Sequence, residues 1–206
     1  MGKAFVSYDM PDVKAKLYLT YEYDALCNLT VTQRLQTTAG SDVPNMMRFG
    51  MTASMPKSFQ KIEYYGRGPV ENYQDRQFSQ RLGIYKQTVD EQFYPYIRPQ
   101  ETGTKTDIRW WNMFNDEGIR VGIAGENRLS MSALNYDIDE LDEGVEKHQR
   151  HPNDLKKADH VTLCIDDIQM GVGGIDSWGA WPLPQHCVTY RNRSFTFCIS
   201  AFKPLR

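Results

Sequence analysis

The chain has 206 residues, of which 40% are hydrophobic and 24% are charged, and its formal net charge is -2. This length and composition suit one globular domain, and no apolar run approaches the roughly 20 residues that span a bilayer. A nearly neutral charge gives no general attraction to nucleic acid, and no basic cluster replaces it. We therefore expect a soluble protein without nucleic-acid or membrane partners; the composition leaves its compartment, cytoplasm or periplasm, open.

Short strand-like runs follow one another along the chain. Residues 15–21 and 29–35 are rich in Leu, Tyr and β-branched side chains on a near two-residue period, and residues 24–28 between them suit a turn. Further strands are predicted at residues 59–65, 119–124, 128–134, 160–170 and 188–202. Short strands at this spacing predict an all-β fold, an antiparallel sandwich.

Residues 136–151 depart from this pattern. Asn135 is a candidate N-cap, acidic residues come early in the run, and Lys147, His148 and Arg150 come late. Opposite charges at the two ends complement a helix macrodipole, although Gly144 weakens the middle. The pattern predicts a short helix.

Residues 171–184, which we call the glycine-rich loop, hold too many Gly and Pro residues for a helix or a central strand. The loop carries Trp178 and Trp181. A loop tryptophan is either an anchor packed into the core, which residue type alone favours, or a platform whose flat face and N–H donor suit a pyranose ring. Trp110 and Trp111 are adjacent, so on a strand one of them would point into the core.

Residues 66–76, which we call the polar segment, combine guanidinium, carboxylate and amide groups in a turn-rich stretch: Arg67, Glu71, Asn72, Asp75 and Arg76. Arginine offers a rigid fork of donors to a carboxylate, so we expect internal hydrogen-bonded struts. A general acid and base is the alternative reading of Glu71 and Asp75, but nearby guanidinium groups favour the ionised carboxylate and disfavour an acid. Glu101 and Asp107, near Arg98 and Arg109, allow the same two readings.

Metal and redox signals are weak. The four cysteines lie far apart, which favours buried or idle thiols over a zinc site and leaves two disulfides open: Cys27, Cys164, Cys187 and Cys198. His148 and His151 form an H-x-x-H pair without an H-E-x-x-H pattern, so a solvated helix end is favoured over a metal site. We predict no metal and no cofactor for this domain.

Several blocks together point to one family. Residues 64–76 read Y-Y-G-R-G-P-V-E-N-Y-Q-D-R and residues 94–103 read Y-P-Y-I-R-P-Q-E-T-G. Further blocks lie at residues 47–51, 107–110, 170–174 and 176–179. In this order they resemble the C-terminal domain, also called the small chain, of LacZ-type β-galactosidases in glycoside hydrolase family 2. The resemblance is clearest over residues 44–203.

The resemblance implies an antiparallel β-supersandwich of the galactose mutarotase-like kind, standing last of five domains. We therefore expect residues 1–206 to be a single domain excised from a longer enzyme, which in the family is a homo-oligomer. The family hydrolyses β-galactosides such as lactose with retention, using two glutamates on a separate TIM barrel as acid/base and nucleophile. No residue of this chain is predicted to be catalytic, and the Mg and Na ions of full-length relatives are expected mainly outside this domain.

The resemblance also implies a role for one tryptophan of the glycine-rich loop. In LacZ-type enzymes the Trp of the D-S-W motif stacks on the sugar in the aglycone position, and here that residue is Trp178, with Asp176 and Ser177 expected to fix the loop. The family often has G-G-D-D-S-W, whereas this chain has Ile175 in place of the first Asp. We therefore expect substrate binding by Trp178, Asp176 and Ser177, and a structural role for Arg67, Glu71, Asn72, Asp75, Arg76, Glu101 and Arg109.

Two alternatives remain at this stage. An autonomous carbohydrate-binding module would use the glycine-rich loop as its sugar platform. A mutarotase-like epimerase rests on fold analogy alone, and it needs a positioned acid/base pair that none of the four His residues signals.

Overall fold

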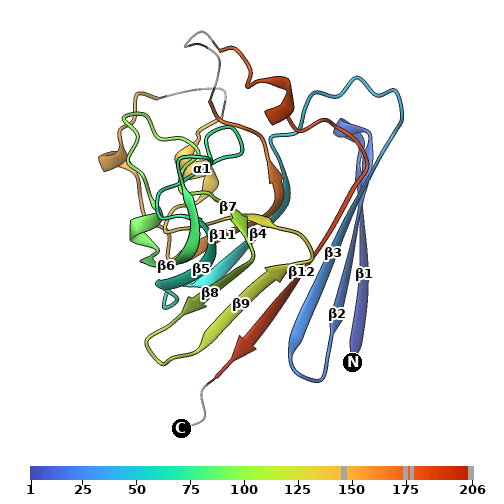
Figure 1. Cartoon of the computed structure of the whole chain (residues 1–206). Coiled ribbons are helices and arrows are strands. Elements are labelled where there is room, and N and C mark those ends of the chain that lie inside the picture. The colour runs from blue at the N-terminus through green and yellow to red at the C-terminus, as the bar shows by residue number, and fades with distance from the viewer. Residues whose placement is uncertain (145–147, 174–175, 177–178, 204–206) are drawn as a thin grey trace.

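Two antiparallel sheets pack face to face in the computed structural model, which describes residues 1–144, 148–173, 176 and 179–203 (Figure 1). The larger sheet has, in spatial order, β1 (Gly2–Met10), β2 (Ala15–Tyr23), β3 (Asn28–Thr37), β12 (Arg193–Phe202), β9 (Arg120–Gly125), β8 (Trp110–Phe114), β5 (Lys61–Gly68) and β6 (Arg81–Thr88). The smaller sheet has β4 (Arg48–Pro56), β11 (His160–Gln169), β10 (Leu129–Leu134) and β7 (Lys105–Ile108). This arrangement confirms the antiparallel supersandwich expected from the sequence.

Helical structure in the described residues is short. The α-helix α1 spans Ile138–Leu141, and 3₁₀ turns lie at Pro11–Val13, Asp90–Gln92, Pro152–Asp154 and Pro184–His186. None of the helices in this part of the chain has the length and apolar character needed to cross a membrane.

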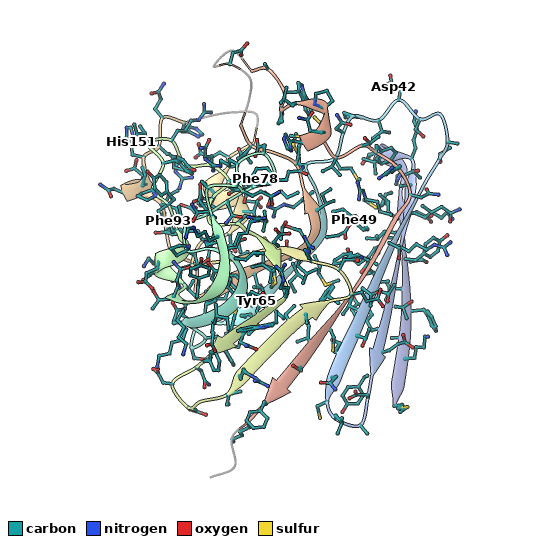
Figure 2. The ribbon with its side chains drawn as sticks, in the orientation of Figure 1. Asp42, Phe49, Tyr65, Phe78, Phe93 and His151 are labelled. Atoms are coloured by element: carbon teal, nitrogen blue, oxygen red, sulfur yellow. The ribbon has the colours of Figure 1, made fainter. Side chains whose placement is uncertain are left out.

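The core lies between the sheets and follows from alternation along the strands. In β5, Ile62 and Tyr64 point inward, and Tyr64 stacks on Trp111 of β8 with ring centroids 5.0 Å apart. Phe49 of β4, labelled in Figure 2, meets Phe195 of β12 edge to face with ring centroids 5.7 Å apart, so this pair joins the two sheets. Trp111 is buried and Trp110 is half-buried, which confirms the alternation predicted for this pair.

Most predicted strands are present, with shifted ends. The hairpin β2–β3 is confirmed, and the Asp24 carboxylate accepts the backbone N–H groups of Leu26 and Asn28 at its turn. The strand predicted at residues 59–65 begins at Lys61 and runs to Gly68, so the polar segment starts inside β5. The strand predicted at residues 188–202 begins only at Arg193. No sequence pattern predicted β1, β4, β6, β7 and β8.

A short helix is present in the stretch predicted at residues 136–151, but it covers Ile138–Leu141, so the predicted extent is wrong. The α-helix ends at Leu141, because Asp142 is extended with φ -134° and Gly144 has φ +83°. Arg150 reaches back to Glu140 and to Glu143, with Nη1 3.0 Å from Glu143 Oε1, so the opposite charges meet across a fold-back of the chain. His148 and His151 therefore share no helix face. Residues 145–147 lie outside the described part.

The four cysteines are free. Cys164 is buried and Cys27 is exposed, whereas Cys187 and Cys198 are half-buried. Neither of the two disulfides that the sequence left open is formed.

Candidate functional site

The glycine-rich loop leaves the sandwich after β11, and its described residues lie beyond the strand ends at the top of Figure 1. It contains no helix or strand among its described residues before the 3₁₀ turn at Pro184–His186. Trp181 and Leu183 are each 48% exposed. Trp178, Ser177 and Ile175 lie outside the described residues. Asp176 is exposed, and its Oδ1 accepts the Ala180 N–H at 3.4 Å.

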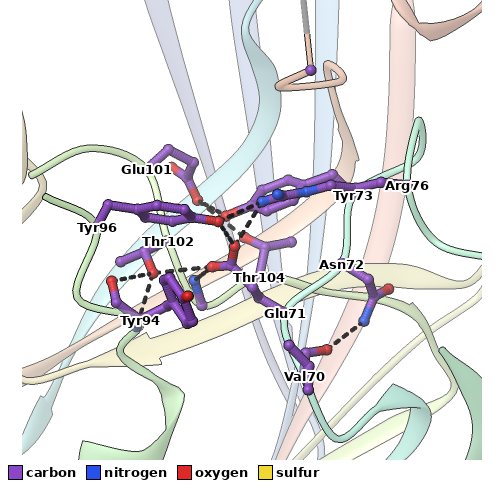
Figure 3. A network of polar contacts seen from close by, with 12 residues as sticks. Val70, Glu71, Asn72, Tyr73, Arg76, Tyr94, Tyr96, Glu101, Thr102 and Thr104 are labelled. Carbon is purple, nitrogen blue, oxygen red and sulfur yellow. Dashed lines mark hydrogen bonds and ion pairs between the residues drawn. The ribbon is translucent and has the colours of Figure 1, made fainter. Parts of the chain in front are cut away.

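The polar segment is held by one carboxylate. Glu71, with a side chain only 5% exposed, accepts hydrogen bonds from Arg76 Nη2 at 2.6 Å, from Thr102 Oγ1 at 3.0 Å and from the Gly103 N–H at 2.7 Å (Figure 3). The Tyr96 hydroxyl also donates to it. Burial and this hydrogen bond raise the pKa of Tyr96. Protein donors thus occupy the Glu71 oxygens, which makes this carboxylate an anchor and leaves no place for substrate on it.

Asn72 is the second anchor and is fully buried. Its Nδ2 donates to the carbonyls of Arg67 and Val70, and its Oδ1 accepts the Thr106 N–H at 3.0 Å. The amide therefore links the turn to β5 through Arg67 and to β7 through Thr106, and it braces the turn internally through Val70.

The predicted arginines also have internal partners. Arg67 Nε lies 2.6 Å from Asp107 Oδ2. Arg109 Nη1 donates to the Asp107 carbonyl at 2.6 Å, and the guanidinium lies over the Tyr65 ring. Arg76 bonds the Tyr96 hydroxyl as well as Glu71, and it lies over the Tyr73 ring. The structure therefore brings these side chains into one connected region at the end of the sandwich.

Asp75 faces the glycine-rich loop instead. Its Oδ2 accepts the Gly173 N–H at 2.7 Å. This contact joins two segments that are 98 residues apart in the sequence.

A cleft of about 610 Å³ lies at the base of the glycine-rich loop. One wall comes from the loop, namely Gly171, Val172, Ala180 and Pro182. The smaller sheet contributes Ser132 of β10 and Thr162 and Cys164 of β11, and the charged and tyrosine lining residues include Arg48, Arg76, Tyr96 and Glu101. The cleft thus combines hydroxyl, amide and charged groups with aromatic and aliphatic surface.

Charge in the cleft is organised around Arg48 of β4. Its Nη2 lies 2.9 Å from Glu101 Oε2, its Nη1 contacts the Cys164 sulfur at 3.2 Å, and its Nε lies 3.7 Å from Asp166 Oδ2. Although burial lowers it, Asp166 and Glu101 raise the pKa of Arg48 above its ordinary value. Burial raises the pKa of Asp166 to about 7. Arg48 therefore remains a fixed cation, and Glu101 serves as its partner.

Sequence reasoning missed several members of this site. Arg48, Gln74 and Tyr96 belong to the matching blocks or lie beside them, but no pattern assigned them partners, because those partners come from distant strands and loops. Lys105 is 1% exposed, and nothing in its local sequence signals a buried amine.

The described residues contain no cluster of three or more His, Cys, Asp or Glu side chains placed to hold a metal ion. His148 Nδ1 lies 3.5 Å from Glu143, and His151 Nδ1 lies 3.2 Å from the Ile97 carbonyl oxygen. The two His side chains of the H-x-x-H pair therefore have separate partners.

The fold and the site together define a class: an antiparallel β-sandwich domain that carries a turn-rich polar motif and an extended glycine-rich loop at one end. Comparison with known proteins identifies the family. The family described as "Beta galactosidase small chain" matches residues 3–199, so the chain belongs to the β-galactosidase small-chain family.

Individual relatives agree with this assignment. The chain is 38% identical over 191 residues to a beta-galactosidase of Priestia megaterium, covering 93% of this chain and 18% of that protein. It is 33% identical over 177 residues to a beta-galactosidase of Lactobacillus delbrueckii subsp. bulgaricus, covering 85% of this chain and 17% of the relative. Beta-galactosidase BgaC of Bifidobacterium adolescentis is 32% identical over 168 residues, which cover 80% of this chain and 15% of that protein. The chain thus spans less than a fifth of the length of these relatives.

Proposed function

We propose that this chain is the C-terminal domain of a β-galactosidase and that it shapes the aglycone side of the active site through the glycine-rich loop. Trp178 stacks on the leaving sugar of a β-galactoside such as lactose, and Asp176 and Ser177 fix the loop around it. The observation that supports the proposal most directly is that the described part of this loop lies outside the core of the sandwich and lines a cleft of mixed polar and apolar surface. The family match spans the same residues.

Alone, the chain is inert in this proposal. Retaining hydrolysis needs two carboxyl groups about 5 Å apart, one on each side of the glycosidic bond. Glu71 and Glu101 each pair with an arginine, Arg76 and Arg48 respectively, and so serve as internal ion-pair partners. The two catalytic glutamates belong to another part of the full-length polypeptide.

Contacts with that polypeptide, and with other subunits, are the second part of the role. β1 is almost entirely exposed along its length, and Phe5 and Tyr8 are 72% and 50% exposed. Large apolar side chains on an edge strand favour a covering partner in the assembled enzyme.

The decisive experiment compares the full-length enzyme with its Trp178→Ala variant. We expect KM for lactose to rise about tenfold, or inhibition by glucose to weaken to that extent, while binding of galactose is nearly unchanged. An aromatic stacking contact contributes up to about 1.5 kcal/mol, and this platform contacts one sugar only. Trp181→Ala in the same loop is the matched control. Unchanged lactose kinetics in Trp178→Ala would refute the role of this ring. The chain alone should release no galactose above background from a chromogenic β-galactoside.

The cleft favours one second candidate, an autonomous carbohydrate-binding module. Its hydroxyl, guanidinium and tyrosine groups are those that pair with sugar hydroxyls, and they are present without any other domain. This alternative predicts saturable quenching of tryptophan fluorescence when the chain is titrated with galactose, glucose or lactose. The inert-domain proposal predicts no saturation.

A further inference from the structure

The glycine-rich loop begins and ends at neighbouring points of the fold. The Gly171 N–H donates to the His186 carbonyl at 2.9 Å, and the Met170 N–H donates to the Met47 carbonyl at 2.8 Å. The two ends of the loop therefore form a narrow base against the start of β4.

One side-chain amide spans this base. Gln74 Nε2 donates to the Gln169 carbonyl at 2.8 Å, before the loop, and to the His186 carbonyl at 2.7 Å, after it. An amide nitrogen carries two N–H groups, so both hydrogens of Gln74 are used, one on each end of the loop. Gln74 thus links the two ends directly.

The carboxylate of the next residue, Asp75, binds the first residues of the loop, 171–173, which we call the outgoing arm. Asp75 Oδ2 accepts the Gly173 N–H at 2.7 Å. A Cβ atom on Gly171 would lie 2.6 Å from Asp75 Cγ, and one on Gly173 would lie 3.0 Å from Asp75 Oδ2. These positions are glycine because the carboxylate packs directly on the backbone, and neither has the left-handed φ that would otherwise require glycine.

We propose that Gln74 and Asp75 are positioning residues that fix the glycine-rich loop and, through it, set the selectivity of the enzyme for the aglycone sugar. The part concerning selectivity rests on the function proposed for Trp178; the part concerning the loop does not. Trp178 is five residues beyond Gly173, so the direction of the arm at Gly173 decides where the ring can reach. A displacement of about 1 Å is enough to impair a positioned contact.

The loop part is tested on the 206-residue chain by amide hydrogen exchange. In Asp75→Ala, the Gly173 amide should exchange about tenfold faster or more, because a hydrogen bond to a charged acceptor is lost. Gln74→Leu should accelerate exchange at Gly171. Asp75→Asn keeps an acceptor oxygen and should restore much of the protection. The matched controls are Asp42→Ala and Gln36→Leu, at exposed positions outside the loop, with Asp42 labelled in Figure 2.

A double-mutant cycle separates a specific contact from general destabilisation. Gly171→Ala should disturb the loop, because its methyl group meets the Asp75 side chain. Asp75→Ala removes that obstacle, so the double variant should be less disturbed than the two single effects added together. Strict additivity would contradict direct packing of Asp75 on the loop.

The selectivity part is tested in the full-length enzyme. Asp75→Ala should raise KM for lactose about tenfold while changing KM for methyl β-galactoside, whose aglycone is a single methyl group, less than about twofold. The combination of Asp75→Ala with Trp178→Ala should raise KM for lactose no further than Trp178→Ala alone, because Asp75 acts through that ring.

Three outcomes would contradict different parts of the proposal. Unchanged exchange of the Gly173 amide in Asp75→Ala overturns the loop part. Equal losses for both substrates overturn the selectivity part. Failure of the function proposed for Trp178 would appear separately, as unchanged lactose kinetics in Trp178→Ala alongside the expected exchange result.

Discussion

The polar segment and the glycine-rich loop lie at the same end of the sandwich, and both are rich in glycine and turns, yet they are held in different ways. In the polar segment, Glu71 and Asn72 are buried and nearly every polar group has a protein partner. In the described part of the loop, Val172 and Trp181 are 43% and 48% exposed, and the contacts to Gln74 and Asp75 gather at its base. The polar segment therefore acts as a rigid support, in which the polar side chains are buried and bonded, whereas the described part of the loop projects from the sandwich and is partly exposed.

This difference indicates that the polar segment contributes mainly to folding stability and the loop mainly to binding. Side chains that bond to backbone groups on several elements hold a turn-rich segment in one conformation. A loop whose described contacts with the polar segment gather at its base keeps a surface for a ligand or for another domain. Substitutions in the polar segment should therefore affect folding first, whereas those in the exposed loop should affect binding first.

The largest expected effect comes from Glu71→Ala. Removing this carboxylate leaves the Gly103 N–H without its acceptor and takes one acceptor each from the Arg76 guanidinium and the Thr102 hydroxyl. Breaking one partner of such a buried network costs about 3–5 kcal/mol. Urea unfolding of the 206-residue chain, followed by circular dichroism, measures the change in the free energy of unfolding.

Glu22→Ala is the matched control for that substitution. Glu22 pairs with Lys3 on the surface at 2.7 Å, and both side chains are about half exposed. Such pairs contribute about 0–1 kcal/mol. Similar losses in the two variants would mean that the Glu71 network has no special role in holding the polar segment.

A smaller effect should appear as a pH dependence centred on Lys105, beneath the polar segment. Burial lowers the pKa of Lys105 from 10.5 to about 7, and its Nζ donates to Gln92 Oε1 at 2.9 Å and to the Gly103 carbonyl at 2.8 Å. Between pH 7 and 10.5 the unfolded chain holds a proton that the folded chain has released, so the folded state gains stability as the pH rises. The gain is limited to a few kcal/mol, at about 1.4 kcal/mol for each pKa unit.

Lys105→Met isolates this titration. The substitution removes the amine that titrates. It also leaves the Gln92 and Gly103 oxygens without this donor, which lowers the free energy of unfolding by an amount that does not depend on pH. Urea unfolding at pH 7.5 and 10 should therefore show wild type gaining stability relative to Lys105→Met. A constant difference between the two proteins at both pH values would contradict a strongly lowered pKa for Lys105.

The all-β fold could be predicted because its signal is local. The alternation in β2, β3 and β11 can be read from a few residues in each strand. β1 has few buried positions, so no apolar face marks it, and it exists through its pairing with β2. The helix predicted from Tyr136 onward was too long, because charge order is the same whether opposite charges lie along a helix or meet in a fold-back, as Arg150 and Glu140 do here.

The site was predictable only in part for a similar reason. The residue types of the polar segment indicated struts, but Arg48 pairs with Glu101 and Arg67 with Asp107 across long sequence separations that no local pattern specifies. The glycines at positions 171 and 173 marked a loop, whereas the reason for them is Asp75, 96 and 98 residues away. Long-range packing decides such pairs, and sequence periodicity contains no information about it.

The smallest expected effect comes from Val172→Ser in the loop. Val172 is 43% exposed, so losing its methyl groups should change the free energy of unfolding by less than about 0.5 kcal/mol. Val161, fully buried in the strand that leads to the same loop, is the matched control; its change to Ser should cost about 2–4 kcal/mol through a cavity and a buried hydroxyl. A loss above about 1.5 kcal/mol for Val172→Ser would show that the outer loop stabilises the fold, and would remove the contrast between support and projection.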